Sequence, residues 1–378
     1  MGAVGTVIYE GGFNKSVSNT ASCDTAKKDI ATGNAVMDNI ETSNTAASHI
    51  ATSNITTATK KGRFAPSPTG QLHLGNIWVA LLSYLHIKQQ GGRYVVRMED
   101  IDTQRSKRSL GEAQLDDLEW LGIEWDEGPR VGGPDGPYWQ SERYDLYEAQ
   151  LEEWRKADKI YPCYCNRARL HSISSAPHGQ DGIAYYDGKC RHLTEAERQA
   201  MEKTPSWRLK AESRNYHFTD IWQGEHDVML QPEVDDFVVR RADNMFAYNL
   251  AVVYDDIAMG ITEIIRGYDL LPAVAHQLWI YELLGAQPPQ YGHVPLIVDE
   301  EGYRLSKRQR SITIKELRES GYSASMIIGR LALQAGFVKP GQIDLQTGLT
   351  VNQLLAINFD NLSLKLHQIK LTNFDIEI

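Results

Sequence analysis

A glycine-containing turn joins an expected strand to an expected helix in GRFAPSPTGQLHLGN, which spans residues 62–76. Unpaired backbone N–H groups and the helix dipole favour an anion at such a junction. Gly70 and Gly75 would allow the backbone to approach a phosphate closely, His73 would add a donor, and two prolines would hold the loop rigid. Many loops contain a similar pattern, so the stretch alone only suggests a phosphate site.

A basic loop, RLSKR, occupies residues 304–308, after an expected strand and a glycine turn. A lysine on such a loop, Lys307, could stabilise a polyphosphate that gains negative charge during a reaction. Most basic loops are solvated surface, so this second stretch is also weak evidence when it is taken by itself.

The elements around these stretches are predicted from hydrophobic periodicity. Leu74, Trp78 and Leu81 recur at helical spacing between a strand that ends near Pro66 and a second strand in RYVVRMED, residues 93–100. Such a βαβ unit implies a parallel sheet that binds ligands at the carboxyl ends of its strands. Further strands are expected in DFVVRR, LAVVYDD and TEIIRG, and further helices at 115–121, 144–158 and 324–335.

Three of the four cysteines, Cys163, Cys165 and Cys190, are close together in the sequence. Four cysteines are too few to suggest a disulfide scaffold in a chain of this length, and their clustering indicates a metal site in a reducing compartment. The alternative is that they are reduced structural cysteines without a metal.

The chain of 378 residues has a net charge of −10, and 42% of its residues are apolar. It contains no apolar run long enough to span a membrane and no secretory signal, so we expect a cytoplasmic protein with no membrane partner. Residues 1–60 are rich in Thr, Ser, Asn and Ala, which predicts a disordered extension.

An acidic total charge does not exclude RNA binding, because the potential that attracts RNA is local. Clusters of basic residues could supply this local potential, although such clusters are more often solvated faces than sites that bind phosphate. The candidates are Arg240 with Arg241, Arg105 with Lys107 and Arg108, and Arg308 with Arg310.

The pair HLGN and RLSK, on this expected topology, resembles the two signatures of the class I aminoacyl-tRNA synthetases. The stretches RFAPSPTGQLHLGN, MEDID, AYNLAVVYDD and GITEIIRGYDLL narrow the resemblance to the glutamyl group, over roughly residues 62–310. The resemblance implies an α/β protein with a Rossmann-like parallel-sheet catalytic domain. Its two halves would be residues 61–160 and 236–312, with an inserted zinc-binding subdomain at 161–235 and a short helical region at 313–378.

The chain after Lys307 is shorter than a typical separate domain, so we expect no anticodon-binding domain. In this short C-terminal part the chain resembles the short paralogues of the group, which attach glutamate to queuosine, a modified base in the anticodon loop of tRNA(Asp). Tyr268 and Leu270 stand where the full-length enzymes usually have Glu and His. Two alternatives stay open: an ordinary glutamyl-tRNA synthetase catalytic fragment, and a non-catalytic relic that binds nucleotide or RNA.

The resemblance also implies roles for single residues, in a protein expected to be a monomer. ATP, accompanied by Mg²⁺, would bind at His73, Gly75, Asn76 and Lys307, of which His73 and Lys307 would be catalytic. Arg304 replaces the usual first lysine of the basic loop. The side chains and backbone that would bind L-glutamate are those of Arg63, Phe64, Ala65, Pro66, Ser67, Glu99, Tyr248 and Arg266.

One structural Zn²⁺ is the second implication of the resemblance. Its ligands would be Cys163, Cys165, Tyr186 and Cys190. Three thiolates and a phenolate could form a closed tetrahedral shell, which is typical of structural rather than catalytic zinc. His192 and Tyr185 are rivals for the fourth position.

Overall fold

The computed structural model describes residues 59–166, 168–170, 186–299, 302–303, 305, 312–357 and 364–371. Nearly all of the expected disordered extension, residues 1–60, lies outside the described residues. Within the described part, no helix combines the length and the apolar character that a membrane span requires.

A parallel four-stranded sheet forms the centre of the described unit, and its strand order is β2-β1-β8-β9. The predicted βαβ unit is confirmed, because one helix connects two adjacent parallel strands. The chain continues from β1 to β2 on one side, and β8 and β9 extend the sheet on the other, so the order reverses at β1. The elements are β1 (Lys61–Phe64), α1 (Leu74–Gln89), β2 (Arg93–Val96), β8 (Glu263–Gly267) and β9 (Gln290–Val294).

Close packing of α1 on β1 depends on a glycine. A Cβ on Gly62 would lie 2.4 Å from Ile87 Cγ1, so the strand and the helix could not pack as closely with any larger residue. Apolar residues of α1, such as Leu74, Ile77 and Leu81, are fully buried in the same core. The predicted helical spacing is therefore the spacing of the buried face.

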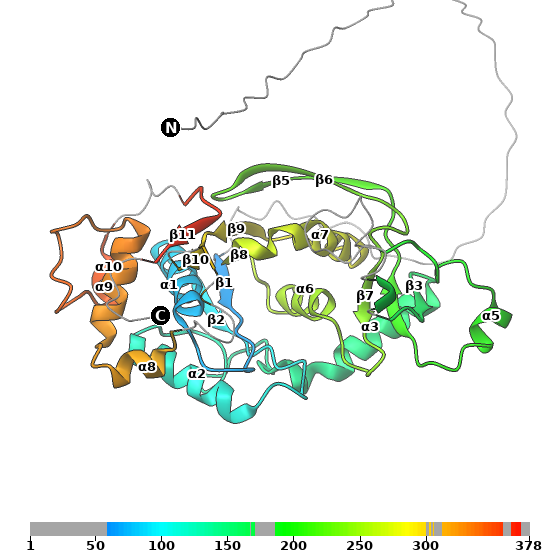
Figure 1. Ribbon diagram of the computed structural model, residues 1–378, viewed down its shortest axis with the longest axis horizontal. Helices are drawn as coiled ribbons and strands as arrows, with labels where there is room; N and C mark the ends of the chain where they lie inside the picture. The colour runs from blue at the N-terminus through cyan, green and yellow to red at the C-terminus, as the bar shows by residue number, and fades with distance from the viewer. Residues whose placement is uncertain are drawn as a thin grey trace, which may run out of the picture. The chain divides into compact units, whose positions relative to one another are not determined.

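Helices surround the sheet, as Figure 1 shows. The helices expected near 115–121, 144–158 and 324–335 are confirmed. A short parallel pair, β10 with β11, brings the last described residues back to the chain that follows β9. The elements are α2 (Arg108–Leu121), η1 (Gln140–Arg143), α3 (Tyr144–Lys156), η2 (Tyr268–Ala273), α7 (Val274–Leu283), β10 (Leu296–Val298), α8 (Ile314–Glu319), α9 (Ala324–Ala335), α10 (Val351–Leu355) and β11 (Gln368–Lys370).

Antiparallel pairs make up the region between α3 and the second part of the sheet. One is the small sheet β3-β4-β7, and the other is the hairpin β5-β6, which lies along α7 and β9 (Figure 1). The strand predicted in DFVVRR is β7. The elements are β3 (Ile160–Cys163), α5 (Glu195–Gln199), β4 (Ser206–Leu209), β5 (Arg214–Asp220), β6 (Gly224–Leu230) and β7 (Phe237–Arg240).

The prediction of a strand in LAVVYDD is wrong, because these residues belong to helix α6 (Tyr248–Ala258). A short apolar run with β-branched residues does not distinguish a strand from a buried helix. Leu250, Ala251, Val252 and Val253 are all buried, so the helix hides apolar side chains around much of its circumference. Tertiary packing thus overrides the strand propensity of the two valines.

We expect Gly62→Ala to destabilise the protein by roughly 1–3 kcal/mol, because the new methyl group would overlap the Ile87 side chain. The free energy of unfolding by urea measures the effect. In an Ile87→Ala background the overlapping atoms are absent, so Gly62→Ala should cost less there. Gly70→Ala is the matched control, since a Cβ on Gly70 would meet open space. Equal costs in both backgrounds would contradict the packing argument.

Candidate active site

The charged residues expected to bind an acidic amino acid lie at the carboxyl edge of the parallel sheet. Arg63 is near the end of β1, Arg266 is near the end of β8, and Glu99 follows β2. Tyr248 is the first residue of α6. Loss of hydration raises the pKa of the Tyr248 phenol, and the charges of the other three residues act on it. The four residues are therefore close enough to interact electrostatically.

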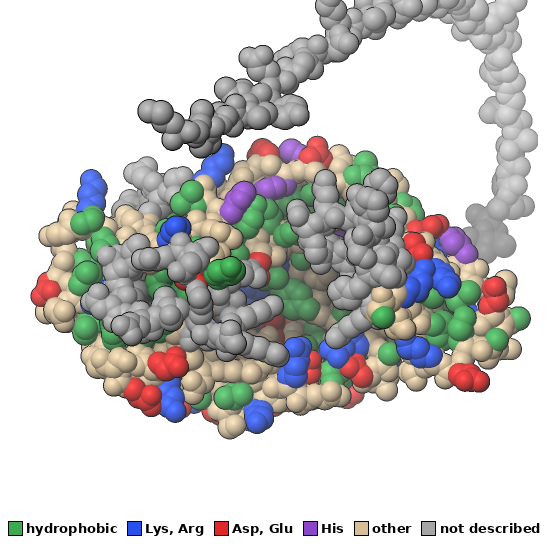
Figure 2. All heavy atoms as spheres, viewed as in Figure 1, with side chains coloured by type: hydrophobic (Ala, Val, Ile, Leu, Met, Phe, Trp, Pro, Cys, Tyr) green, Lys and Arg blue, Asp and Glu red, His purple; other side chains and the backbone are tan. Residues whose placement is uncertain are grey.

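One face of the molecule has a hollow. The face drawn in Figure 2 is hollowed near its middle, where Figure 1 shows β1 and α6, and basic and acidic side chains lie along its lower rim. Tyr248 is 36% exposed, whereas Arg63, Glu99 and Arg266 are buried. Of these four side chains, Tyr248 is therefore the one that solvent reaches most.

Asp256, near the end of α6, accepts hydrogen bonds from two arginines. Arg63 donates through Nε (3.1 Å) and Nη2 (3.4 Å), and Arg97 donates through Nη1 (2.7 Å). Burial by itself would raise the pKa of Asp256, but Arg63 and Arg97 outweigh it and the pKa is lowered. Asp256 therefore stays ionised and fixes the direction of the Arg63 side chain.

Glu99 has one carboxylate oxygen engaged and one open. Arg97 Nη2 donates to its Oε1 (3.0 Å), whereas no described residue donates to its Oε2. Burial raises the pKa of Glu99, and Arg97 and Arg63 act in the opposite direction. The backbone N–H of Glu99 donates to Pro66 O (2.9 Å), which joins it to the loop after β1. The open oxygen can accept a donor such as a ligand ammonium group.

Asp255 connects α6 to the elements beneath it. It accepts hydrogen bonds from Arg143 Nε (2.6 Å), Gln140 Nε2 (2.8 Å) and Tyr147 OH (2.8 Å), and Arg97 Nε lies 3.7 Å away. The arginines under the sheet edge thus each have a carboxylate partner, as buried charges require.

Arg266 differs from those arginines because neutral groups hold it. Its Nε donates to His293 Nε2 (2.9 Å), its Nη1 to Gln277 Oε1 (2.8 Å) and its Nη2 to Leu270 O (3.1 Å). It is 3% exposed, and among the described residues no carboxylate forms an ion pair with it. One N–H on each Nη remains available. A buried guanidinium without a carboxylate partner favours an anionic ligand.

The residues that follow Arg63 form the start of the loop beside Glu99. Phe64 and Pro66 are buried, Ala65 is partly exposed and Ser67 is exposed. Gln114 of α2 donates to Ser67 O (3.2 Å) and so supports the loop from below. Of this group, Ser67 has the side chain that is open to a ligand from solvent.

His73 caps the amino end of α1. Its Nδ1 accepts a hydrogen bond from Asn76 N (3.3 Å), and its backbone N–H donates to Asn76 Oδ1 (3.1 Å). A Cβ on Gly75 would lie 3.1 Å from His73 Cε1, so Gly75 leaves room for the ring. Burial lowers the pKa of His73 to about 4. The imidazole is therefore a neutral donor near pH 7, with its proton on Nε2.

Lys307 and Arg304 lie outside the described residues, but the chain on both sides of Lys307 is described. Leu305 N donates to Ile297 O (3.4 Å), and Leu74 N donates to Ile312 O (3.1 Å). Ile314 N donates to Leu72 O (3.0 Å), so residues 312–314 pair with the turn that holds His73. The chain that follows the basic loop is therefore anchored beside the start of α1.

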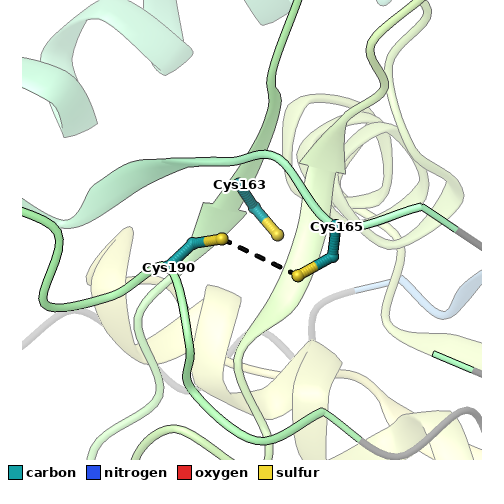
Figure 3. A group of neighbouring side chains, drawn as sticks. All are labelled: Cys163, Cys165 and Cys190. Carbon is teal, nitrogen blue, oxygen red and sulfur yellow. Dashed lines mark hydrogen bonds between the residues drawn. The ribbon is translucent and has the colours of Figure 1, made fainter. Parts of the chain in front are cut away.

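The predicted cysteine cluster is present, as Figure 3 shows. The sulfur atoms of Cys163, Cys165 and Cys190 all lie within 4.8 Å of one another, and those of Cys165 and Cys190 are 3.7 Å apart. A tetrahedral zinc with Zn–S bonds of ~2.3 Å places its sulfur ligands about 3.8 Å apart, so the spacing fits zinc. The hydrogen bond with Cys190 and the charge of Arg208 keep the pKa of the Cys163 thiol below its ordinary value.

Tyr186 lies beside this cluster, and His192 does not. The Tyr186 hydroxyl is 3.9 Å from Cys163 Sγ and accepts a hydrogen bond from Cys190 N (3.0 Å). The His192 side chain is 71% exposed and its Nε2 is 2.7 Å from Glu233. Tyr185 lies outside the described residues. Of the two candidates that the structure describes, Tyr186 has the better geometry for a fourth ligand.

Sequence reasoning missed several residues that hold the site. Arg97 directly precedes the quoted MEDID, and Asp255 and Asp256 end the quoted AYNLAVVYDD, so the motifs contained a signal for them. His293 and Gln277, which hold Arg266, had no comparable signal, because their roles arise from contacts between distant segments.

The basic patches that the structure describes carry neighbouring carboxylates. Arg105 and Arg241 both pair with Asp102. Arg240 pairs with Glu148, and Arg108 pairs with Glu142 and stacks over a tryptophan ring. Lys107 is exposed, and Arg308 and Arg310 lie outside the described residues. These ion pairs weaken the local positive potential.

A pocket of about 460 Å³ lies at the start of β9, and the ring of its lining residue Tyr291 is 5.0 Å from the Arg266 guanidinium. Its lining comes from the β5 strand, α7 and the chain before β9, and contains several tyrosines and prolines but no arginine or lysine. Among the described lining residues, His217 is the only basic side chain, whereas the sheet edge has two buried arginines, so the sheet edge is the better candidate site for an acidic ligand.

Comparisons with known proteins identify the family. A family model described as tRNA synthetases class I (E and Q), catalytic domain, matches residues 60–370. The chain is 47% identical to the glutamyl-Q tRNA(Asp) synthetase of Symbiobacterium thermophilum over 283 residues, which cover 73% of this chain and 87% of the relative.

Two further matches come from glutamate enzymes. The chain is 41% identical to glutamate–tRNA ligase 2 of Syntrophus aciditrophicus, with 74% of this chain and 58% of the relative covered. The crystal structure of glutamate-tRNA synthetase from Elizabethkingia anophelis superposes with a TM-score of 0.68 at 30% identity, and the match covers 83% of this chain and 68% of that one. The fold and these matches show that the chain belongs to the class I tRNA synthetases of the E and Q group.

Proposed function

We propose that this protein activates L-glutamate with ATP as glutamyl-adenylate and transfers the glutamate to queuosine in the anticodon loop of tRNA(Asp). The observation that carries the first part is the buried Arg266, which has hydrogen-bond acceptors but no carboxylate partner among the described residues. The second part rests on the similarity to relatives that are named for that reaction.

Glutamate would complete the charge balance of the site. Its side-chain carboxylate would accept hydrogen bonds from Arg266, with Tyr248 and Arg63 beside it. Its ammonium group would donate to the open oxygen of Glu99. A neutral analogue would leave the Arg266 charge unpaired, which is a strong basis for discrimination.

ATP would bind where α1 begins. The neutral His73 would donate through Nε2 to a phosphate oxygen, with Gly75 and Asn76 holding the ring in place. Lys307 would stabilise the leaving pyrophosphate, because the chain beyond its loop is anchored at the same turn. Mg²⁺ would accompany ATP and screen its phosphate charges.

The reaction would need no nucleophile from the protein. The α-carboxylate of glutamate attacks the α-phosphorus of ATP, a new P–O bond forms, and pyrophosphate leaves with the electron pair of the broken bond. A hydroxyl of queuosine then attacks the carbonyl carbon of the adenylate, loses its proton and displaces AMP. Catalysis would come from positioning and from stabilisation of charge.

Zinc would serve a structural role away from this chemistry. Cys163, Cys165 and Cys190 would bind it with Tyr186 as the fourth ligand, and the closed shell would fasten β3 to the chain near Cys190.

The choice of tRNA is tested by charging assays. We expect the protein to attach radiolabelled glutamate to queuosine-containing tRNA(Asp), and to leave queuosine-free tRNA(Asp) and tRNA(Glu) unlabelled. Labelling of tRNA(Glu) at a comparable rate would instead assign the ordinary glutamyl-tRNA synthetase activity. The absence of glutamate-dependent ATP–pyrophosphate exchange would favour a non-catalytic relic.

The state of His73 is tested by ¹⁵N NMR, with His73→Asn used to assign its signal. We expect a proton on Nε2 at pH 7 and a transition near pH 4, because burial opposes the charged form. A transition near the ordinary value of about 6.5 would contradict this. Since the unfolded chain takes up this proton at higher pH than the folded chain, His73 should lower stability as pH falls from about 6.5 towards about 4.

The metal site is tested by elemental analysis of the purified protein. We expect one zinc per chain, its loss in Cys163→Ser and Cys190→Ser, and a lower melting temperature after chelation. Cys23→Ser and His192→Ala are the controls and should retain the metal. Zinc-free protein with reduced cysteines and an unchanged melting temperature would support structural cysteines without a metal.

A further inference from the structure

The last residue of β5, Asp220, is a buried carboxylate that is held in a fixed orientation beside the turn of the β5-β6 hairpin. Its Oδ1 accepts backbone hydrogen bonds from Trp222 N (3.0 Å), Gln223 N (3.0 Å) and His293 N (3.1 Å). Its Oδ2 lies 2.6 Å from His293 Nδ1. Three donors thus fix which oxygen faces the histidine ring.

This arrangement determines which nitrogen of His293 carries the proton. His293 is 0% exposed, so its ring has no solvent to bind. Because the carboxylate of Asp220 can only accept, the proton of the neutral ring must be on Nδ1. Nε2 is then an acceptor, and Arg266 Nε donates to it (2.9 Å). Burial keeps the pKa of His293 below its ordinary value, which favours this neutral form.

The side-chain amide of Gln277 holds the other side of Arg266. Gln277 Nε2 donates to Asn249 Oδ1 (3.1 Å), which leaves Gln277 Oε1 to accept from Arg266 Nη1 (2.8 Å). Asn249 follows Tyr248 in α6, so the first turn of α6 acts on Arg266 only through Gln277. The three acceptors of the guanidinium are on β9, on α7 and, at Leu270 O, on η2, and all of them are neutral.

We propose that Asp220, through the tautomer of His293, is a positioning residue that aims Arg266 at an anionic side chain and so helps to select glutamate. This inference rests on the proposed function, since it concerns how the same site recognises its amino acid. Asp220 supplies the negative charge that orients the relay, while the neutral imidazole in between leaves the guanidinium charge unpaired for the ligand.

The replacement Asp220→Asn separates this role from a packing role. The two side chains have the same shape, and the three backbone donors require the remaining oxygen to take the place of Oδ1. The amide nitrogen would then face His293 Nδ1 and donate to it, which forces the ring proton onto Nε2. Two N–H groups, His293 Nε2–H and Arg266 Nε–H, would face each other, and Arg266 would have to move.

The test uses glutamate-dependent ATP–pyrophosphate exchange with the full chain. We expect Asp220→Asn to raise the KM for glutamate about tenfold or more, the scale of one lost charged hydrogen bond, with the KM for ATP nearly unchanged. The ratio of kcat/KM for glutamate to kcat/KM for glutamine should fall. His293→Leu should behave in the same way, and His293→Gln should recover most of the affinity, because its amide can donate to Asp220 and accept from Arg266.

The same hairpin offers matched controls. His217 and Glu225 form an exposed histidine–carboxylate pair (3.0 Å), and His217→Gln and Glu225→Gln should keep the wild-type KM for glutamate. ¹⁵N NMR should show the His293 proton on Nδ1 in the wild type and on Nε2 in Asp220→Asn.

The outcomes separate this inference from the proposed function. A wild-type protein without glutamate-dependent exchange would overturn the proposed function. A wild type with exchange, together with an Asp220→Asn variant of unchanged glutamate KM, would overturn only the positioning role. An equal rise in the KM for ATP and for glutamate, with a lowered melting temperature, would also overturn it, because that pattern indicates general loosening of the site.

Discussion

The carboxylate of Asp256 is the interaction on which the site depends. It lies under the carboxyl edge of the sheet and joins Arg63 of β1 to Arg97 after β2, while α6 supplies the carboxylate itself. Removing one member would leave an unpaired buried charge, which typically costs ~3–5 kcal/mol. The pairing therefore holds two strands and a helix in one arrangement, and Glu99 is positioned through Arg97 as part of it.

Charge balance explains why the arginines at this edge have different roles. Arg63 is directed by Asp256 and can contribute only the part of its guanidinium that remains free. Arg266 has hydrogen-bond partners that orient it but no carboxylate partner among the described residues, so its charge is available to pair with an anionic ligand. If a carboxylate stood in the place of His293, the guanidinium would be neutralised before the substrate arrived.

The central sheet could be predicted from the sequence, because β1, α1 and β2 form a local unit with clear periodicity and a glycine turn. Arg63, Glu99 and Arg266 were expected at the site from the resemblance to the glutamyl group. The structure places them at or just after strand ends, and their binding of glutamate stays a prediction. The helix α6 was not predicted, and the ion pairs that Asp255 and Asp256 of this helix form were therefore missed as well. On a strand, Asp255 and Asp256 would point to opposite faces, but on a helix they are about 100° apart, and both reach Arg97, while Arg143 contacts Asp255 and Arg63 contacts Asp256.

The relay from Asp220 could not be predicted either, because it joins three segments that are distant in the sequence: the end of β5, β9 and β8. Its physical consequence concerns specificity more than affinity. At 4 Å and an effective dielectric constant of about 20, a carboxylate interacts with a guanidinium by about 4 kcal/mol, and an amide of the same shape loses most of this. Charge rather than shape would therefore distinguish glutamate from glutamine, and a neutral acceptor such as His293 keeps that charge available while it fixes the geometry.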